Sequence, residues 1–118
     1  MKVINSSDVE ARDLTNQPLF TGGEVEGKFV IGTEMAKELG VAVIAFTPGS
    51  RNVFHTHNTE QILYVTEGKG IVATENEEVV ATPGMFFFIP AGESHWHGAT
   101  KDSSFTHLAI APPHTTDF

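Results

Sequence analysis

The chain has 118 residues, of which 40% are hydrophobic and 19% are charged, a balance typical of one globular domain. It contains no cysteine, which excludes disulfides, thiolate metal sites and a thiol nucleophile. A net charge of -8 disfavours nucleic acid and anionic membranes as partners. No apolar run is long enough for a membrane helix and the start lacks a signal-peptide hydrophobic region, so we expect a cytoplasmic protein with a single domain over 1–118.

The first part of the chain has weak structural signals. Residues 1–18 are polar without a sustained hydrophobic period, which predicts an N-terminal arm. Residues 19–20 and 28–33 are predicted to be short strands, because glycines separate them from their neighbours. Residues 33–40 contain helix formers but are too few for a stable helix, so they form one helical turn or a strand edge.

From Gly40 onward, short apolar segments recur between turn residues. Pro-Gly pairs at 48–49 and 83–84 interrupt them, and little helical periodicity is present. This pattern predicts an all-β fold, an antiparallel sandwich or barrel. The segments expected to be strands are 41–47, 61–67, 69–75, 77–82, 85–89 and 104–110.

Two histidines one residue apart precede the segment 61–67. Successive side chains of a strand point to opposite faces, so His55 and His57 project to the same side and two imidazoles converge on one ion. Gln61 has the same alternation and continues into the inner face of the strand, which makes it the third candidate ligand. A shifted register would turn Glu60 inward instead and give the site a carboxylate.

A second pair of histidines, His95 and His97, follows a turn shaped by Pro90 and Gly92. These two also share one strand face. His107 lies in the last predicted strand with the alternation that would bring it to the same cavity. For His97 and His107 two interpretations remain open, a catalytic role or a hydrogen-bonding and packing role. His114 follows a Pro-Pro pair and is expected to be simply exposed.

Both histidine segments resemble the two motifs of the cupin superfamily, with matching spacing. The first motif corresponds here to Gly49, His55, His57, Gln61 and Gly68, and the second to Gly84, Pro90, Gly92 and His95. Gln61 stands where the superfamily usually has glutamate, and Ala99 where it usually has asparagine. The resemblance covers residues 40–111 and implies a small double-sheet jelly-roll barrel with one metal ion inside.

A closer resemblance is to the cupins related to carboxymuconolactone decarboxylase, a group that includes the manganese-dependent hydroxynitrile lyases. It implies His55, His57, Gln61 and His95 as ligands of one divalent ion, which could be manganese, iron, nickel or zinc. It also implies that His97 and His107 line the cavity and are the catalytic candidates. Asn52 and Ser94 differ from the threonine and lysine that the lyases carry at these positions.

Three functions are consistent with these residues. The first is a metal-dependent enzyme, such as a lyase, that performs acid–base chemistry on a small carbonyl or hydroxy compound. The second is a non-haem iron dioxygenase, which fits less well because Gln61 replaces the carboxylate of the usual ligand triad. The third is a non-catalytic metal or small-ligand binding module.

The segment Met85–Ile89 carries aromatic side chains on both strand faces. One face can fill the barrel, while the other needs a cover, which favours a homodimer. Trp96 alternates away from His95 and His97 and is predicted to pack on the opposite face of its strand.

Overall fold

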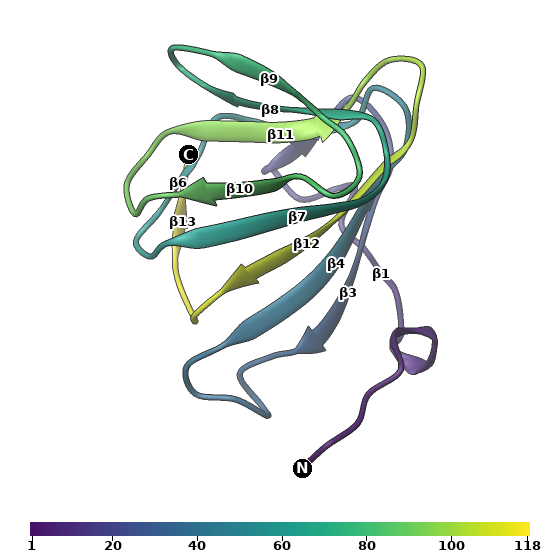
Figure 1. Ribbon diagram of the computed structural model, residues 1–118, viewed down its shortest axis with the longest axis vertical. Helices are drawn as coiled ribbons and strands as arrows, with labels where there is room; N and C mark the ends of the chain where they lie inside the picture. Colours follow the sequence, from purple (N-terminus) through teal and green to yellow (C-terminus); the bar gives the residue numbers. More distant parts are fainter.

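Two antiparallel β-sheets face each other in the computed structural model, which describes residues 1–118 (Figure 1). The larger sheet has six strands in the order β1-β3-β4-β12-β7-β10, and the smaller has five in the order β2-β5-β11-β8-β9. A third, two-stranded sheet pairs β13 with β6. The predicted all-β jelly-roll fold is therefore confirmed.

The strands are short and separated by tight turns, as the spacing of glycine and proline predicts. One 3₁₀ helix, Ser6–Asp8, precedes them. The strands are β1 (Arg12–Asp13), β2 (Phe20–Thr21), β3 (Val25–Ile31), β4 (Gly40–Phe46), β5 (Arg51–Asn52), β6 (Thr56–His57), β7 (Gln61–Gly68), β8 (Gly70–Thr74), β9 (Glu78–Ala81), β10 (Phe86–Ile89), β11 (His95–Ala99), β12 (Phe105–Ala111) and β13 (Thr116–Asp117).

The core lies between the two sheets and follows the alternation of the sequence. In β7, Gln61, Leu63 and Val65 are buried while Ile62 is exposed on the other face. Two large aromatic side chains from adjacent regions of the six-stranded sheet, Phe46 and Phe105, are almost fully buried in this core. A sheet that is apolar on one face folds in this way because that face must be removed from water.

The N-terminal region joins the barrel from residue 12, within the segment 1–18 that was predicted to be an arm. Residues 12–13 form β1 and pair with β3, so they belong to the larger sheet. The side chain of Leu14 is buried in the core. Residues 1–11 contain only the 3₁₀ helix and extend away from the barrel in Figure 1. Residues 33–40 hold a single turn, in which the amide of Ala36 donates to the carbonyl of Gly32 at 2.9 Å.

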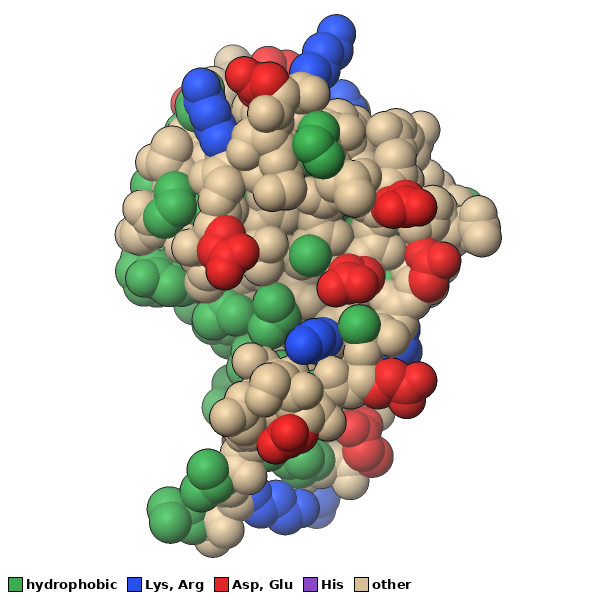
Figure 2. Space-filling view, turned by 90° about the vertical axis from the view of Figure 1, so that its right-hand side faces the viewer, with side chains coloured by type: hydrophobic (Ala, Val, Ile, Leu, Met, Phe, Trp, Pro, Cys, Tyr) green, Lys and Arg blue, Asp and Glu red, His purple; other side chains and the backbone are tan.

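A backbone hydrogen bond from the turn before β11 joins the two histidine segments. The amide of Gly92 donates to the carbonyl of His57 at 2.8 Å, and Gly92 has the positive φ of 81° that glycine adopts at low cost. This bond holds the start of β11 beside β6. Acidic side chains are spread over the outer surface that Figure 2 shows. No helix in the structure is long and apolar enough to span a bilayer.

Candidate metal centre

His55 and His95 face each other across neighbouring segments. Each donates its backbone amide to the other's carbonyl at 3.0 Å, forming an isolated antiparallel bridge. Directly opposed residues of such a pair place their side chains on the same side. The two ring centroids are 4.2 Å apart, and the ring of His57 lies 4.8 Å from that of His55. The three imidazoles predicted to converge are therefore in contact.

The outer ring nitrogen of each of these histidines has a hydrogen-bond partner. Nδ1 of His55 donates to the carbonyl of Val53 at 2.7 Å, and Nδ1 of His95 donates to that of Glu93 at 2.9 Å. Nδ1 of His57 is hydrogen-bonded to Oγ1 of Thr116 at 3.0 Å, and a metal ion on Nε2 would require Nδ1 to be the donor. A neutral imidazole that donates from Nδ1 keeps its lone pair on Nε2. Partners of this kind fix the tautomer and orientation of histidines that bind metals.

Several buried polar atoms at this end of the barrel lack a hydrogen-bond partner. They include Nε2 of His57, Nε2 of His95 and Oε1 of Gln61. Oγ1 of Thr59 is likewise unpaired. Leaving a buried acceptor unpaired costs about 1–3 kcal/mol, so a group that accepts the lone pairs of these atoms would be stabilised here. A divalent cation has this property. Glu60, the alternative ligand, is exposed to solvent while Gln61 is buried.

The trio whose ring nitrogens lie close enough together to share one ion is a different one, in which His97 takes the place of His57. His55, His95 and His97 each offer a ring nitrogen, and these atoms lie within 4.8 Å of one another. The three side chains are buried. Three histidines of this chain could therefore hold a metal ion, and the two sets share His55 and His95. In the first set His57 and Gln61 complete the metal site. In the second set His97 completes it.

The nitrogens of His97 are already engaged in a buried hydrogen-bond chain. Oδ1 of Asn52 accepts the backbone amide of His97 at 2.8 Å, which orients the Nδ2 group of Asn52 toward Nε2 of the ring at 3.1 Å. Nε2 of His97 is thus an acceptor, and its Nδ1 donates to Nε2 of His107 at 3.0 Å. Nδ1 of His107 in turn donates to the carbonyl of Leu108 at 3.1 Å. Every ring nitrogen in this chain is paired without a metal ion.

Burial keeps these imidazoles neutral. It lowers the pKa of His55 to about 4 against the opposing hydrogen bond to Val53, and that of His57 to about 3 with help from the neighbouring histidines. Burial likewise lowers the pKa of His95, and lowers that of His97 well below its ordinary value. The pKa of His107 falls to about 4, again through burial. Neutral imidazoles are the form that binds metals and accepts protons.

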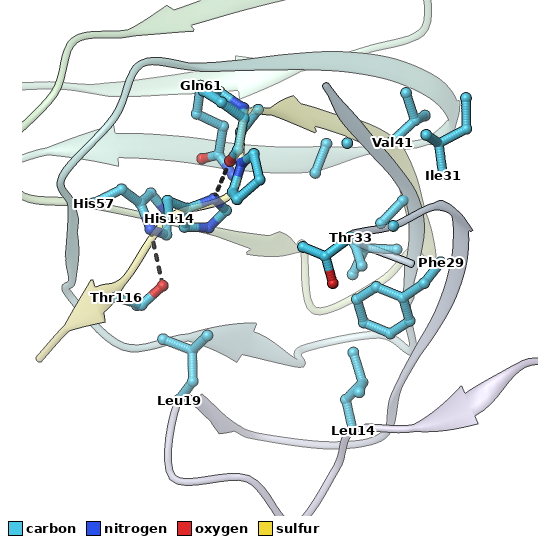
Figure 3. Close-up of a pocket in the computed structure, with 18 of the residues that line it drawn as sticks. Leu14, Leu19, Phe29, Ile31, Thr33, Val41, His57, Gln61, His114 and Thr116 are labelled. Carbon is cyan, nitrogen blue, oxygen red and sulfur yellow. Dashed lines mark hydrogen bonds between the residues drawn. The ribbon is translucent and has the colours of Figure 1, made fainter. Parts of the chain in front are cut away.

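A cavity of about 460 Å³ opens beside the histidines. Its wall includes His55, His57, Gln61, His97 and His107, so the sequence-predicted residues except His95 line it directly. Figure 3 shows His57, His114 and Gln61 close together, with apolar side chains along other parts of the wall, among them Leu14, Leu19, Phe29, Ile31 and Val41. The cavity therefore combines a polar end with an apolar chamber suited to a small organic molecule.

The structure shows contacts of three residues outside the predicted ligand set. Asn52 orients His97, and Thr116 bonds to His57 across 59 positions of sequence. His114 is exposed, as expected, but it also lines the cavity and its ring lies 4.7 Å from that of His57. Strand alternation gives no signal for these contacts, because each joins segments distant in the chain.

Trp96 lies on the opposite face of β11, as alternation predicts. It is buried beneath the guanidinium of Arg51, whose Cζ is 3.5 Å from the ring centroid. This arrangement closes the outer face of β11, which explains why every residue of the strand is buried. The packing of Trp96 and Arg51 therefore supports the strand that carries His95 and His97 on its opposite face.

The fold and this histidine cluster are those of a cupin, and comparison with known proteins agrees. The chain matches the cupin domain family over residues 42–111, more than half its length, and belongs to that family. It is 43% identical over 70 residues to an (R)-mandelonitrile lyase from Granulicella tundricola. That alignment covers 58% of this chain and 53% of the relative, so the chain spans about half the length of the curated relative it matches.

Solved structures show the same architecture. A predicted oxalate decarboxylase from Thermotoga maritima is 27% identical with a TM-score of 0.84, covering 94% of this chain and 98% of the other. The polyketide cyclase RemF from Streptomyces resistomycificus has a TM-score of 0.85 at 24% identity, covering 100% of this chain and 86% of the other. The latter similarity supports the fold alone.

Proposed function

We propose that this cupin is a metal-dependent lyase that acts on a small hydroxy or carbonyl compound, with cyanohydrin cleavage as the specific reaction. The observation that carries the proposal is the group of unpaired buried atoms on His57, His95 and Gln61. The similarity to a mandelonitrile lyase supports the choice of substrate. A cavity lined by histidines outside the ligand set supports an enzyme rather than a passive binding module.

Of the two possible ligand sets, we favour His55, His57, Gln61 and His95. Nε2 of His97 accepts a hydrogen bond from Asn52 and its Nδ1 donates to His107, so neither nitrogen needs a metal. In contrast, Nε2 of His57 and Oε1 of Gln61 are buried without partners. Filling an unsatisfied acceptor is worth more than replacing a bond that already exists. Manganese, iron, nickel and zinc all suit this donor set.

A divalent ion at this position would supply Lewis-acid polarisation of a substrate oxygen. The neutral ligand set leaves the full dipositive charge, which favours this chemistry over the oxygen activation of an iron dioxygenase, since no carboxylate ligand is present. The apolar chamber formed by residues such as Phe29 and Val41 would receive the organic part of the substrate. The same wall limits the access of water to the polar end.

His97 and His107 would take part in the transfer of the substrate's hydroxyl proton. Both are neutral because burial lowers their pKa values, so each presents a lone pair at neutral pH but holds an added proton only weakly. His97 lines the cavity, and its Nε2 could exchange the hydrogen bond from Asn52 for that of a substrate hydroxyl. His107 accepts from Nδ1 of His97 and thereby fixes which nitrogen carries the lone pair. In cyanohydrin cleavage the hydroxyl proton would pass to Nε2 of His97, the carbon–cyanide bond would break, and cyanide would take the proton back.

The proposal is tested by mandelonitrile cleavage with protein loaded in turn with manganese, iron, nickel and zinc. We expect turnover in at least one metal form, and a loss of at least tenfold in His97→Gln and His107→Ala with the metal retained. Absence of turnover in all four forms contradicts the lyase. Oxygen consumption by the iron form would favour the dioxygenase alternative.

A further inference from the structure

The three histidines of the proposed ligand set are oriented in two different ways. His55 and His95 each donate Nδ1 to a carbonyl two residues earlier in the same segment, at 2.7 and 2.9 Å. Their orientation is therefore built into the local backbone. Nδ1 of His57 is instead hydrogen-bonded to the side chain of Thr116, which lies in β13. The direction of the unpaired Nε2 of His57 thus depends on a strand that is remote in sequence.

Further contacts hold β13 against the same short stretch of chain. The amide of Thr115 donates to Oδ1 of Asn58 at 2.8 Å, and the amide of Asn58 donates to the carbonyl of Thr115 at 3.4 Å. The ring of His114 packs edge-on against that of His57, with centroids 4.7 Å apart. Figure 3 shows Thr116, His114 and His57 together at one end of the cavity. The segment 114–116 therefore contacts one proposed ligand on several sides.

The segment 114–116 that covers His57 is short and lies close to solvent. The strand β13 has two residues, Thr116 is only half-buried, and Asp117 is exposed. Elements with few buried apolar contacts open locally at low free energy, well below that of global unfolding. When β13 opens, Nδ1 of His57 loses its partner and the imidazole is free to rotate away from the direction that a metal ion needs.

We propose that Thr116 is a positioning residue for His57, and that docking of β13 and metal binding stabilise each other. This inference rests on the metal centre of the proposed function. A partner of this kind typically contributes 10- to 100-fold to metal affinity. Coupling between two binding events is reciprocal, so a bound ion must also suppress opening of β13 by the same factor. The segment 114–116 would then open less often when the metal ion is bound than when the metal site is empty.

The first test measures the affinity for Mn²⁺, using the electron paramagnetic resonance signal of the free ion. Thr116→Val removes the hydroxyl with little change in shape, and we expect its Kd to rise about tenfold or more. Thr116→Ser keeps a hydroxyl and should restore an affinity close to that of the unsubstituted chain. Thr115→Val is the matched control, because it makes the same chemical change next door, where the structure assigns hydrogen bonds only to the backbone.

The second test uses hydrogen exchange and does not depend on any variant folding well. Adding Mn²⁺ to the unsubstituted chain should slow exchange at the amides of Thr115 and Asn58, because the ion favours the docked segment. The amide of Val9, which bonds within the 3₁₀ turn, should be unaffected. Equal Mn²⁺ affinity for the unsubstituted chain and Thr116→Val, or equal exchange with and without the ion, overturns the inference while leaving the metal centre intact. Failure of the unsubstituted chain to bind any of Mn²⁺, Fe²⁺, Ni²⁺ and Zn²⁺ overturns both; if it binds one of the others in place of Mn²⁺, both tests are made with that ion.

Discussion

Gln61 is the residue that sets the charge of the proposed metal centre. Three neutral imidazoles and an amide leave a divalent ion with its full charge, whereas a glutamate at the same position would reduce it by one. The buried Oε1 of Gln61 has no hydrogen-bond partner, which is the property expected of an oxygen ligand. The side chain at position 61 therefore affects both the affinity of the site for a divalent ion and the Lewis acidity of the bound ion.

Gln61→Glu should therefore bind Mn²⁺ about tenfold more tightly or better, because hard divalent ions prefer carboxylate oxygen. Its turnover of mandelonitrile should fall, since the ion becomes a weaker Lewis acid. Glu60→Gln is the control, because it makes the opposite change at the adjacent, exposed position and should alter neither value. Equal Mn²⁺ affinity in Gln61→Glu and the unsubstituted chain would show that residue 61 is not a ligand.

The buried histidines make the metal-free protein sensitive to acid. Their pKa values are lowered by burial, to about 4 for His107, while in the unfolded chain they return to about 6.5. Below pH 6.5 the unfolded state takes up protons that the folded state does not, so the free energy of unfolding falls as the pH drops toward 4. His107 alone should account for about 2 kcal/mol between pH 7.5 and 5.

Urea unfolding of the metal-free chain at these two pH values measures the effect. We expect lower stability at pH 5, and a smaller difference between the two pH values in His107→Gln. A free energy of unfolding that is the same at both pH values would contradict the neutral, buried state assigned to these side chains.

At the scale of elements, two glycines with positive φ show where the turns are tightly constrained. Gly68 ends β7 with a φ of 76°, and Gly84 precedes β10 with a φ of 94°. A Cβ at Gly68 would collide with the carbonyl oxygen of Ser104, whereas one at Gly84 would meet no atom within 4 Å. Both substitutions strain the backbone, but only the first also creates a steric clash with a neighbouring backbone.

Gly84→Ala should therefore lower the free energy of unfolding by about 1 kcal/mol, and Gly68→Ala by about 3 kcal/mol or more. The two variants serve as controls for each other, because the chemical change is identical. Chemical denaturation of both, followed by circular dichroism, makes the comparison. Equal losses of stability would contradict the close approach of the Gly68 turn to residue 104.

Sequence alternation predicted the strands and the common face of His55 and His57, because both depend on local geometry. The approach of His95 to His55 joins distant segments and was expected only from the family resemblance. The period of two in 61–67 correctly placed Gln61 on the inner face of β7. The contacts of Asn52 and Thr116 could not be predicted, because they span 45 and 59 residues and depend on how the sheets pack. The boundary of the N-terminal arm was missed because β1 has only two polar residues.

At the scale of the whole molecule, the strand β10 presents an uncovered aromatic face. Phe86 and Phe88 are 70% and 60% exposed, while Phe87 is half-buried and Ile89 is buried on the inner face. The strand lies at the edge of the six-stranded sheet, where unpaired backbone groups also invite a partner. The sequence-based prediction of a homodimer remains a prediction, and this face is where we place the contact.

Sedimentation at micromolar concentration should show a dimer, and Phe88→Lys should shift it toward a monomer by placing a charge in the apolar contact. Val3→Lys is the control, because Val3 is exposed outside the sheets and its replacement should leave the dimer unchanged. A species of 12.8 kDa only, in the unsubstituted chain, would contradict the dimer.

The central claim is that His57, rather than His97, completes the metal centre with His55, His95 and Gln61. Elemental analysis of chain purified without chelator tests it most directly, with His57→Ala and His97→Gln compared under the same conditions. We predict one divalent ion per unsubstituted chain, loss of the stoichiometric ion in His57→Ala, and retention of it in His97→Gln, whose imidazole is paired with Asn52 and His107. Full occupancy in His57→Ala together with loss in His97→Gln would contradict the account and assign the ion to His55, His95 and His97.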